Sequence, residues 1–483
     1  MRYVPNPGDA AGLARRSTFL ARALACGAAA VSLCEACADQ PTAPAAIVSH
    51  RAIVDVKGSV VDPAVVAVVR QLAAARGIVS LEPPGRVRAQ LSELGQLLLF
   101  DPILSGNRNI ACATCHLASF ATGDGRALSI GEGGTDFGPT RIHPEGVFIP
   151  RNAPPLFNLV AMKHLFWDGR VQVDGSGQIV SPAGGQLTPA MRQVFEFGPV
   201  SVLGMFPVTN RAEMRGQPAS GNELAAIPDD DFAAIWSALM RRLGDVPEYR
   251  ARFEAAYPGQ RFDDMTFAHA SNAIGGFLVD RVSFTNTPWD RFLRGDDGAL
   301  TSRQLAGAQT FLSLKCSICH NGATLSDDRF HDVAVAQIGP GEGDGAGGRD
   351  DFGRMRVTGN PADRYLFRTT PLRNVELTAP YGHDGAIASL RGFIEHYSES
   401  DIKLNAFDPG ALEPALRGTL VPNAAAILAQ RDTLLAGVVL SDDLVDKLMD
   451  YMQTLTDDAA RNLSRLVPAR VPSKLPVAPR ERP

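Results

Sequence analysis

The sequence predicts a mainly α-helical protein built from two related domains with long loops. Apolar residues recur at helical spacing in several segments, whereas no alternating run is long enough for a large sheet. A short pattern of two cysteines and one histidine occurs twice, which indicates an internal repeat. With 483 residues, of which 45% are apolar and 20% charged, the chain can form more than one buried core.

The first 38 residues predict an export signal. Arg15 and Arg16 precede a small-residue apolar run from Ala23 to Cys34, and Ala36-Cys37-Ala38 offers the small residues of a cleavage site. The apolar run is too short to span a bilayer stably. An uncleaved amphipathic helix is the alternative. We therefore expect a periplasmic protein.

Charge and hydropathy exclude two classes of partner. The formal net charge of -5 gives no strong attraction to nucleic acid, and no apolar stretch is long enough to predict a membrane span. Cys26, Cys34 or Cys37 could carry a lipid anchor, but none follows a good lipobox, so this is the less favoured alternative.

The rest of the chain is expected to fall into four segments. Pro41 and Pro44 indicate a tether, and the Pro-rich, basic C-terminus indicates disorder. The predicted organisation after the signal at 1–38 is an N-terminal tether and helix at 39–80, a first domain at 81–295, a second domain at 296–466 and a disordered tail at 467–483.

Helical spacing predicts the individual elements. Helices are expected within 60–100 and at 231–256, 264–281 and 301–315, the last ending at the second cysteine pair. A further helix begins after Ser441, which can cap its first turn. The Gly-rich, acidic stretch 339–352 is predicted to be a solvated, flexible loop rather than a metal site.

The two repeated motifs give the strongest functional signal. They are Cys112-Ala113-Thr114-Cys115-His116 and Cys316-Ser317-Ile318-Cys319-His320. Two thiols one helical turn apart can form thioethers with both vinyl groups of one porphyrin, and the histidine that follows can bind its iron. A zinc site would not need a histidine after each pair, and a redox disulfide would not occur twice with histidine. The sequence therefore predicts two covalent c-type haems, in agreement with export.

Roughly residues 90–460 resemble the bacterial di-haem cytochrome c peroxidases and the related MauG enzymes. The order of four markers and their placement relative to the haem motifs make this resemblance specific. The markers are Arg151-Asn152-Ala153-Pro154, Phe166-Trp167-Asp168-Gly169-Arg170, Pro207-Val208-Thr209-Asn210-Arg211-Ala212-Glu213-Met214, and Leu372-Arg373-Asn374-Val375 followed by Thr378-Ala379-Pro380-Tyr381-Gly382-His383-Asp384-Gly385.

The resemblance implies roles for five of these residues. Trp167 matches the tryptophan that carries electrons between the haems, and Glu213 matches the catalytic acid and base above the peroxidatic haem. Asn152, Thr378 and Pro380 match positions that hold a structural Ca²⁺, a cation that prefers oxygen ligands. Without this context, Trp167 would be interpreted as a packing residue, Glu213 as a solvated carboxylate, and Thr378 with Pro380 as part of a turn.

For the far ligands of the two irons, the sequence offers alternatives. The family's ligand position on the second haem corresponds to Tyr397, where the peroxidases have Met and MauG has Tyr. His396 is the alternative, but adjacent side chains on a helix point about 100° apart, so only one of the two can face the iron. His143 is a candidate removable ligand of the first iron, or an exposed loop histidine.

The resemblance implies a di-haem oxidoreductase that uses hydrogen peroxide to form high-valent haem iron. The reducing partner would be a small redox protein. A MauG-like enzyme that oxidises aromatic residues of a partner protein is the alternative. A non-catalytic electron carrier is less favoured, because it needs both haems to be permanently six-coordinate. No sequence feature supports a haem-based sensor.

Overall fold

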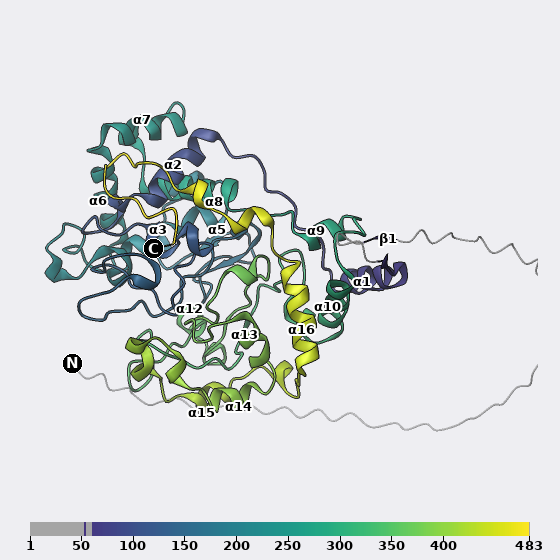
Figure 1. Cartoon of the computed structure of the whole chain (residues 1–483). Coiled ribbons are helices and arrows are strands. Elements are labelled where there is room, and N and C mark those ends of the chain that lie inside the picture. The colour runs from purple at the N-terminus through teal and green to yellow at the C-terminus, as the bar shows by residue number, and fades with distance from the viewer. Residues whose placement is uncertain (1–52, 55–59, 483) are drawn as a thin grey trace, which may run out of the picture. The chain divides into compact units, whose positions relative to one another are not determined.

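The computed structural model describes residues 53–54 and 60–482, and they form a mainly α-helical fold with long loops (Figure 1). The predicted signal peptide and most of the predicted tether lie outside the described residues. None of the described helices combines the length and the hydropathy needed to cross a membrane.

The helices fall into two sets along the chain, α1 to α9 before residue 296 and α10 to α16 after it. Those of the first set are α1 (Pro63–Ala75), α2 (Ala89–Phe100), α3 (Cys112–Cys115), α4 (Pro189–Val194), α5 (Pro199–Leu203), α6 (Phe232–Gly244), α7 (Pro247–Ala256), α8 (Phe267–Arg281) and α9 (Pro288–Leu293). Those of the second set are α10 (Ser302–Ser313), α11 (Cys316–Cys319), α12 (Met355–Thr358), α13 (Leu390–His396), α14 (Ser400–Asn405), α15 (Ala424–Leu428) and α16 (Asp442–Gln453).

The strands are short and antiparallel, in agreement with the prediction that no large sheet forms. Three small sheets are present among the described residues. They pair β1 (Ile53–Val54) with β2 (Val60–Val61), β3 (His164–Leu165) with β4 (Val171–Val173) and β5 (Ile179–Val180), and β6 (Phe330–His331) with β7 (Phe367–Arg368).

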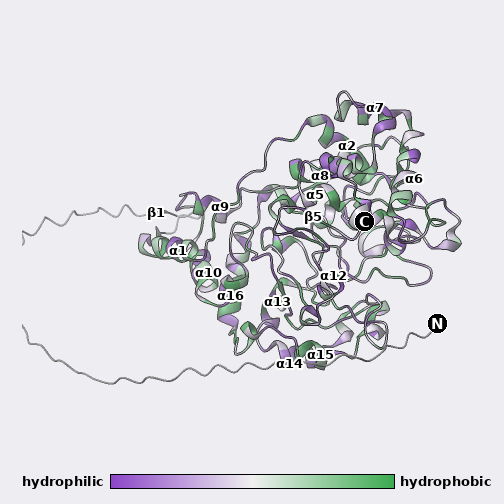
Figure 2. Cartoon of the chain, turned by 180° about the vertical axis from the view of Figure 1, so that it is seen from behind, coloured by the Kyte–Doolittle hydropathy of each residue, from purple (hydrophilic) through white to green (hydrophobic). Residues whose placement is uncertain are grey.

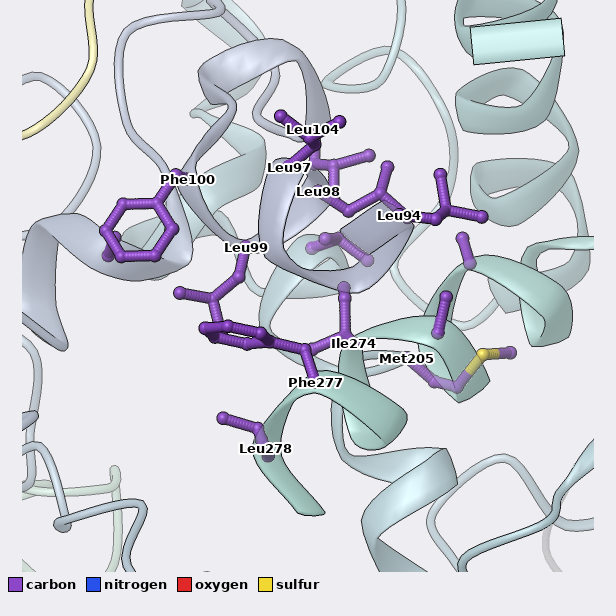
Figure 3. Packing of buried hydrophobic residues seen from close by; sticks show 14 of the residues in the cluster. Leu94, Leu97, Leu98, Leu99, Phe100, Leu104, Met205, Ile274, Phe277 and Leu278 are labelled. Carbon is purple, nitrogen blue, oxygen red and sulfur yellow. The ribbon is translucent and has the colours of Figure 1, made fainter. Parts of the chain in front are cut away.

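The first hydrophobic core is built around α2 and α8. Figure 3 shows Leu94, Leu97 and Leu98 of α2 beside Ile274 and Phe277 of α8. The two helices approach so closely that a Cβ at Gly95 would lie 1.8 Å from the carbonyl oxygen of Ala273, so only glycine fits there. The first cysteine pair packs against this core.

The second core repeats this arrangement with α10 and α16, which lie side by side with α1 against α10 (Figure 1). Here a Cβ at Gly307 would lie 2.1 Å from the carbonyl oxygen of Lys447. Cys316 packs against this core. In each half, therefore, the helix before the cysteine pair crosses a later helix at a glycine.

Most of the predicted helices are present, with small changes of boundary. The segment predicted at 231–256 is divided into α6 and α7, because Pro247 begins a new helix. Ser441 caps α16 as predicted, since its side chain accepts a hydrogen bond from the backbone N–H of Leu444. In Figure 2 the helices carry both green and purple stretches, as expected for elements with one buried face.

The prediction of a disordered tail at 467–483 is wrong for the described residues 467–482. Val471 is fully buried in the first core, and the hydroxyl of Ser473 donates to the buried carboxylate of Asp101 at 2.6 Å. The segment, drawn in yellow, passes α2 and ends near α3 (Figure 1). Composition indicated disorder, but apolar residues spaced along the proline-rich segment pack against α2 and its neighbours.

Candidate haem sites and the segment between them

The first Cys-x-x-Cys-His motif forms the short helix α3 and the turn after it. The side-chain oxygen of Thr114 accepts the backbone N–H of Ala111 at 3.0 Å, which begins the helix. Nδ1 of His116 lies 2.8 Å from the carbonyl oxygen of Thr122. Because a carbonyl can only accept, Nδ1 carries the proton, and Nε2 is left with its lone pair for a metal.

The second motif repeats this geometry in α11. Nδ1 of His320 lies 3.0 Å from the carbonyl oxygen of Leu325, so its Nε2 is likewise left as a ligand. Burial lowers the pKa of both His116 and His320, which favours the neutral, metal-binding form of each ring. The four thiols are free, and no disulfide joins either pair. All of this fits covalent haem attachment with histidine ligation.

Among the described residues, one group of side chains could correspond to the zinc alternative, but the contacts of its histidine argue against a zinc site. Cys319, Asp327 and His331 approach one another closely enough to hold a metal ion. However, Nε2 of His331 lies 3.0 Å from Asp327, and Nδ1 lies 2.6 Å from Asp432. A ring with a carboxylate at each nitrogen is held as an imidazolium, which has no free lone pair for a metal, and Cys319 belongs to the second haem motif. Accordingly, the pKa of His331 is raised to about 11, chiefly by its bond to Asp327.

Glu213 lies on a rigid turn beside the first motif. It is part of a single π-helical turn, η7 (Arg211–Arg215). Asn210 caps this turn, because the side-chain oxygen of Asn210 accepts the backbone N–H groups of Ala212 at 2.9 Å and of Glu213 at 3.0 Å. Arg211 and Arg215, on either side of Glu213, both bind the carboxylate of Asp229. Such turns are frequent at functional sites.

The electrostatics relate Glu213 to the first cysteine pair. Burial raises the pKa of the Glu213 carboxyl; Arg170 and Arg151 oppose this shift, and Glu342 adds to it. Burial also raises the pKa of the Cys112 thiol to about 12, and Glu213 contributes to that shift. The tertiary structure thus brings a carboxyl group that protonates readily to the motif that begins about a hundred residues earlier.

Trp167 is buried between segments from the two halves of the chain. Its indole Nε1–H donates to the carbonyl oxygen of Asn152 at 2.9 Å, and its own carbonyl accepts the backbone N–H of Arg368 at 2.9 Å. The side chain is 8% exposed. Its hydrogen bonds therefore link it to both halves.

Arg368 is a buried cation that sequence reasoning missed. Its guanidinium donates to the carbonyl oxygens of Phe166 and Thr369 and contacts the sulfur of Met162, and it forms no ion pair with any described residue. Burial lowers its pKa to about 10. Main-chain carbonyl oxygens, rather than a carboxylate, therefore compensate this buried charge.

Near the second motif, the side chains of Tyr397 and His396 have different surroundings. Burial raises the pKa of the Tyr397 phenol, and the thiols of Cys316 and Cys319 add to the shift, so the phenol lies near the second attachment site. Nε2 of His396 lies 2.8 Å from the carbonyl oxygen of Val333, so the ring is already engaged elsewhere. These contacts favour Tyr397 over His396 as the residue that faces the second haem.

His143 is held by its own loop. Its Nδ1 accepts the backbone N–H of Glu145 at 3.0 Å, and its ring packs on Gly133. These contacts do not relate it to the first motif, and its ligation to the first iron stays a prediction.

Two of the predicted calcium ligands line one small cavity. Asn152 and Thr378 surround a space of about 10 Å³ together with Ala379 and Asp124. The Nδ2 group of Asn152 donates to the carbonyl oxygens of Arg126 and Ala127, which leaves Oδ1 free to bind a cation. Pro380 follows Ala379 but does not line the cavity. Sequence reasoning missed Asp124, a buried acidic residue that lines the same cavity.

The Gly-rich stretch 339–352 is solvated as predicted at residues 343 and 345–348, but one of its acidic residues is buried. Its Asp351 is 3% exposed, and both of its carboxylate oxygens accept from Arg151, at 2.6 and 2.8 Å. The prediction missed this buried end of the loop because Gly-rich, acidic composition does not reveal a buried cation elsewhere in the chain. Two acidic residues of the loop, Asp351 and Glu342, are ion-pair partners for that cation, Arg151.

Comparison with known proteins identifies the family of this chain. The family model described as di-haem cytochrome c peroxidase matches residues 89–298. Cytochrome c551 peroxidase of Pseudomonas aeruginosa is 30% identical over 305 residues, which cover 63% of this chain and 70% of that protein. The methylamine utilization protein MauG of Methylorubrum extorquens is 28% identical over 308 residues, which cover 63% of this chain and 67% of that protein.

A solved structure matches over a larger part of the chain. It is that of a MauG-like protein associated with microbial copper homeostasis, with a TM-score of 0.53 and 25% identity, covering 79% of this chain and 95% of that one. Together with the two Cys-x-x-Cys-His motifs and their free Nε2 atoms, these similarities determine the family. The chain belongs to the di-haem cytochrome c peroxidase family, and it is a peroxidase-type oxidoreductase with two c-type haems.

Proposed function

We propose that this protein reduces hydrogen peroxide at its first haem and receives electrons through its second. Cys112, Cys115 and His116 would hold the first haem. Cys316, Cys319 and His320 would hold the second, with Tyr397 as its far ligand. Two cytochrome c-like domains, at 81–295 and 296–466, and a periplasmic location complete the proposal.

The observation that carries this function is the position of Glu213. A c-type haem with one open coordination site supplies the binding and reduction of peroxide. A carboxyl group with a raised pKa, held on a rigid turn beside the haem-binding cysteines, is suited to general acid–base work. Glu213 would take the proton from one oxygen of hydrogen peroxide and deliver it to the other, so that water leaves.

The test is the substitution Glu213→Gln. The variant should keep both haems and lose roughly 10²-fold or more in its rate of reaction with peroxide, because the amide cannot accept and return the proton. Stopped-flow spectroscopy of the diferric protein measures this rate. Glu132→Gln is the matched control, since Glu132 is an acidic residue in the loop that contacts the same turn. Equal rates in wild type and Glu213→Gln would refute the role of Glu213.

Two kinds of electron source remain as candidates. A small redox protein would make the chain a conventional peroxidase, whereas aromatic side chains of a partner protein would make it MauG-like. Tyr397 favours the second, because Tyr ligation stabilises higher oxidation states of haem iron than Met does. Steady-state oxidation of a reduced small cytochrome supports the first, and mass spectrometry that finds oxidised aromatic residues in an exported partner supports the second. Two low-spin haems that are indifferent to peroxide would instead indicate an electron carrier.

We also propose a Ca²⁺ ion in the cavity lined by Asn152 and Thr378, with Pro380 supplying a backbone oxygen. The free Oδ1 of Asn152 and the carboxylate of Asp124 support the proposal, because Ca²⁺ prefers several oxygen ligands with at least one charge. Calorimetric titration of the chelator-treated holoprotein should find one site, and Asp124→Asn should weaken it about tenfold or more. The absence of any calcium binding would refute this part of the proposal.

A further inference from the structure

Arg151 is the centre of a buried ion-pair cluster beside Trp167. Its Nη1 donates to Asp168 at 2.6 Å, while Nε and Nη2 donate to the two oxygens of Asp351 at 2.6 and 2.8 Å. Glu342 lies 3.4 Å away from Nε, and the ring of Phe367 lies below the guanidinium. Arg151 is 7% exposed, so these charges are compensated within the protein rather than by water.

The cluster joins the two dipeptides that carry the indole and its hydrogen-bond acceptor. Arg151 precedes Asn152, and Trp167 precedes Asp168. The side chain of Arg151 binds the side chain of Asp168, while the indole of Trp167 binds the main chain of Asn152. The two dipeptides are therefore connected at both ends, and this fixes how the indole ring is turned.

Asp351 brings the second half of the chain into this arrangement. Its backbone N–H and C=O both bind the side chain of Gln337, at 3.0 and 2.7 Å. Gln337 in turn accepts from Asn423 at 2.8 Å. One oxygen of Asp351 also accepts the backbone N–H of Gly353 at 2.8 Å. The carboxylate is thus held by the frame of the second half while it binds Arg151 of the first half.

We propose that Asp351 is a positioning residue for electron transfer, which sets the orientation of Trp167 through Arg151. The inference rests on the proposed role of Trp167 as the relay between the two haems. Arg151 is suited to the task because its planar fork binds two carboxylates in a fixed geometry. The loop 339–352, which by its composition is only a solvated connection, would then influence the rate of electron transfer between the haems.

The experiment compares Asp351→Asn with Asp350→Asn in the holoprotein. Asp350 is its neighbour in the same loop, but it binds Tyr365 and Arg364 rather than Arg151. One equivalent of reductant is mixed with the diferric protein, and the redistribution of the electron between the two haems is followed by stopped-flow spectroscopy. Asp351→Asn should slow this step roughly tenfold, since small misplacements of a functional group are costly. Asp350→Asn should leave it unchanged.

Three further measurements separate positioning from general damage. The rate of the first haem with peroxide and the haem content should be unchanged in Asp351→Asn, and Asp351→Glu should restore part of the transfer rate. If Asp351→Asn fails to incorporate both haems, Arg151→Lys replaces it, because Lys keeps the charge but loses the fork; it should slow the transfer to a similar extent.

Trp167→Phe distinguishes the two ways in which the inference can fail. If Trp167→Phe slows the transfer and Asp351→Asn does not, Asp351 has no positioning role and the relay stands. If neither variant slows it, the relay itself is wrong and the inference fails with it. A uniform slowing of transfer and of the peroxide reaction in Asp351→Asn would also overturn the inference, because that result indicates a structural effect only.

Discussion

The two haem-attachment sites are alike within their motifs and differ in what the rest of the chain brings to them. Each cysteine pair forms one helical turn, and each histidine donates from Nδ1 to a carbonyl oxygen a few residues later. Each motif also follows a helix that crosses a later helix at a glycine. The attachment of haem is therefore a local property, repeated in both halves.

Beyond the motifs, the surroundings diverge. The first site receives the carboxyl group of Glu213, whose pKa burial raises. The second receives the phenol of Tyr397 and an imidazolium, His331, fixed between Asp327 and Asp432. The first site thus receives a carboxyl group that can exchange a proton, whereas the second receives a bulky phenol and a fixed cation. The difference shows that segments remote from each motif, and not the motif itself, give each site its chemical surroundings.

The strongest way to break the comparison is to remove one haem at a time. Cys112→Ser with Cys115→Ser should abolish the reaction with peroxide, because the site beside Glu213 loses its cofactor. Cys316→Ser with Cys319→Ser should keep the first reaction with peroxide and lose steady turnover. A pyridine haemochrome assay checks that one haem is left in each variant. A peroxide reaction that survives only in the first variant would reverse the assignment of the two sites.

The pH dependence of the peroxide reaction sharpens the contrast. Since burial raises the pKa of Glu213 above the ordinary 4.5, its carboxyl stays protonated to a higher pH than usual. A protonated carboxyl cannot accept the first proton from peroxide, so the rate should fall as the pH falls through the raised pKa. Stopped-flow rates from pH 4 upwards should show this inflection, and Glu213→Gln should lack it. An inflection that persists in Glu213→Gln would assign it to another group.

At the second site, Tyr397→Met tests the ligand. Methionine as an axial ligand raises the reduction potential of haem iron, so the potential of the second haem should rise and that of the first should not. Spectroscopic redox titration resolves the two haems. Tyr381→Phe is the control, because Tyr381 donates to Val375 and has no part in the proposed ligation. A potential that Tyr397→Met leaves unchanged, together with a shift in His396→Ala, would favour His396.

The smallest predicted effect concerns the C-terminal segment, which only the first core possesses. Val471→Ala should lower the free energy of unfolding by about 2 kcal/mol, because it leaves a cavity in a packed core. Lys474→Ala, at an exposed position nearby, should change it by less than about 0.5 kcal/mol. Denaturant unfolding of the holoprotein measures both. Equal stabilities would mean that the segment does not stabilise the fold.

Some features were predictable from sequence because they depend on neighbours along the chain. The helical class, the cap at Ser441 and the position of α8 follow from local spacing and chemistry. The same holds for the thiols and histidines of the two motifs. The order of the tail at 467–482 and the buried end of the loop at 339–352 were missed, because composition describes the average behaviour of a segment and not the particular surface that it meets.

The remaining site features came from contacts between distant segments. The sequence around Arg368 does not indicate that its cation is buried without a carboxylate partner. The sequence around Asp351 does not indicate its ion pair with Arg151. Asp124 joined the proposed calcium cavity only because Asn152 and Thr378 meet it in space. The resemblance supplied Trp167, Glu213 and Tyr397, and the geometry added the groups that hold or surround them.

By itself, the sequence determined that two haems are attached and that the fold is helical, because covalent attachment and helix formation need residues that are close along the chain. The resemblance led us to expect Glu213 at the first motif and Tyr397 at the second, and contacts between distant segments bring them there. Tertiary structure alone decided that Arg151 binds Asp351. The physical reason is that burial and charge compensation depend on which distant segments pack together, and those set the pKa values and orientations on which the chemistry depends.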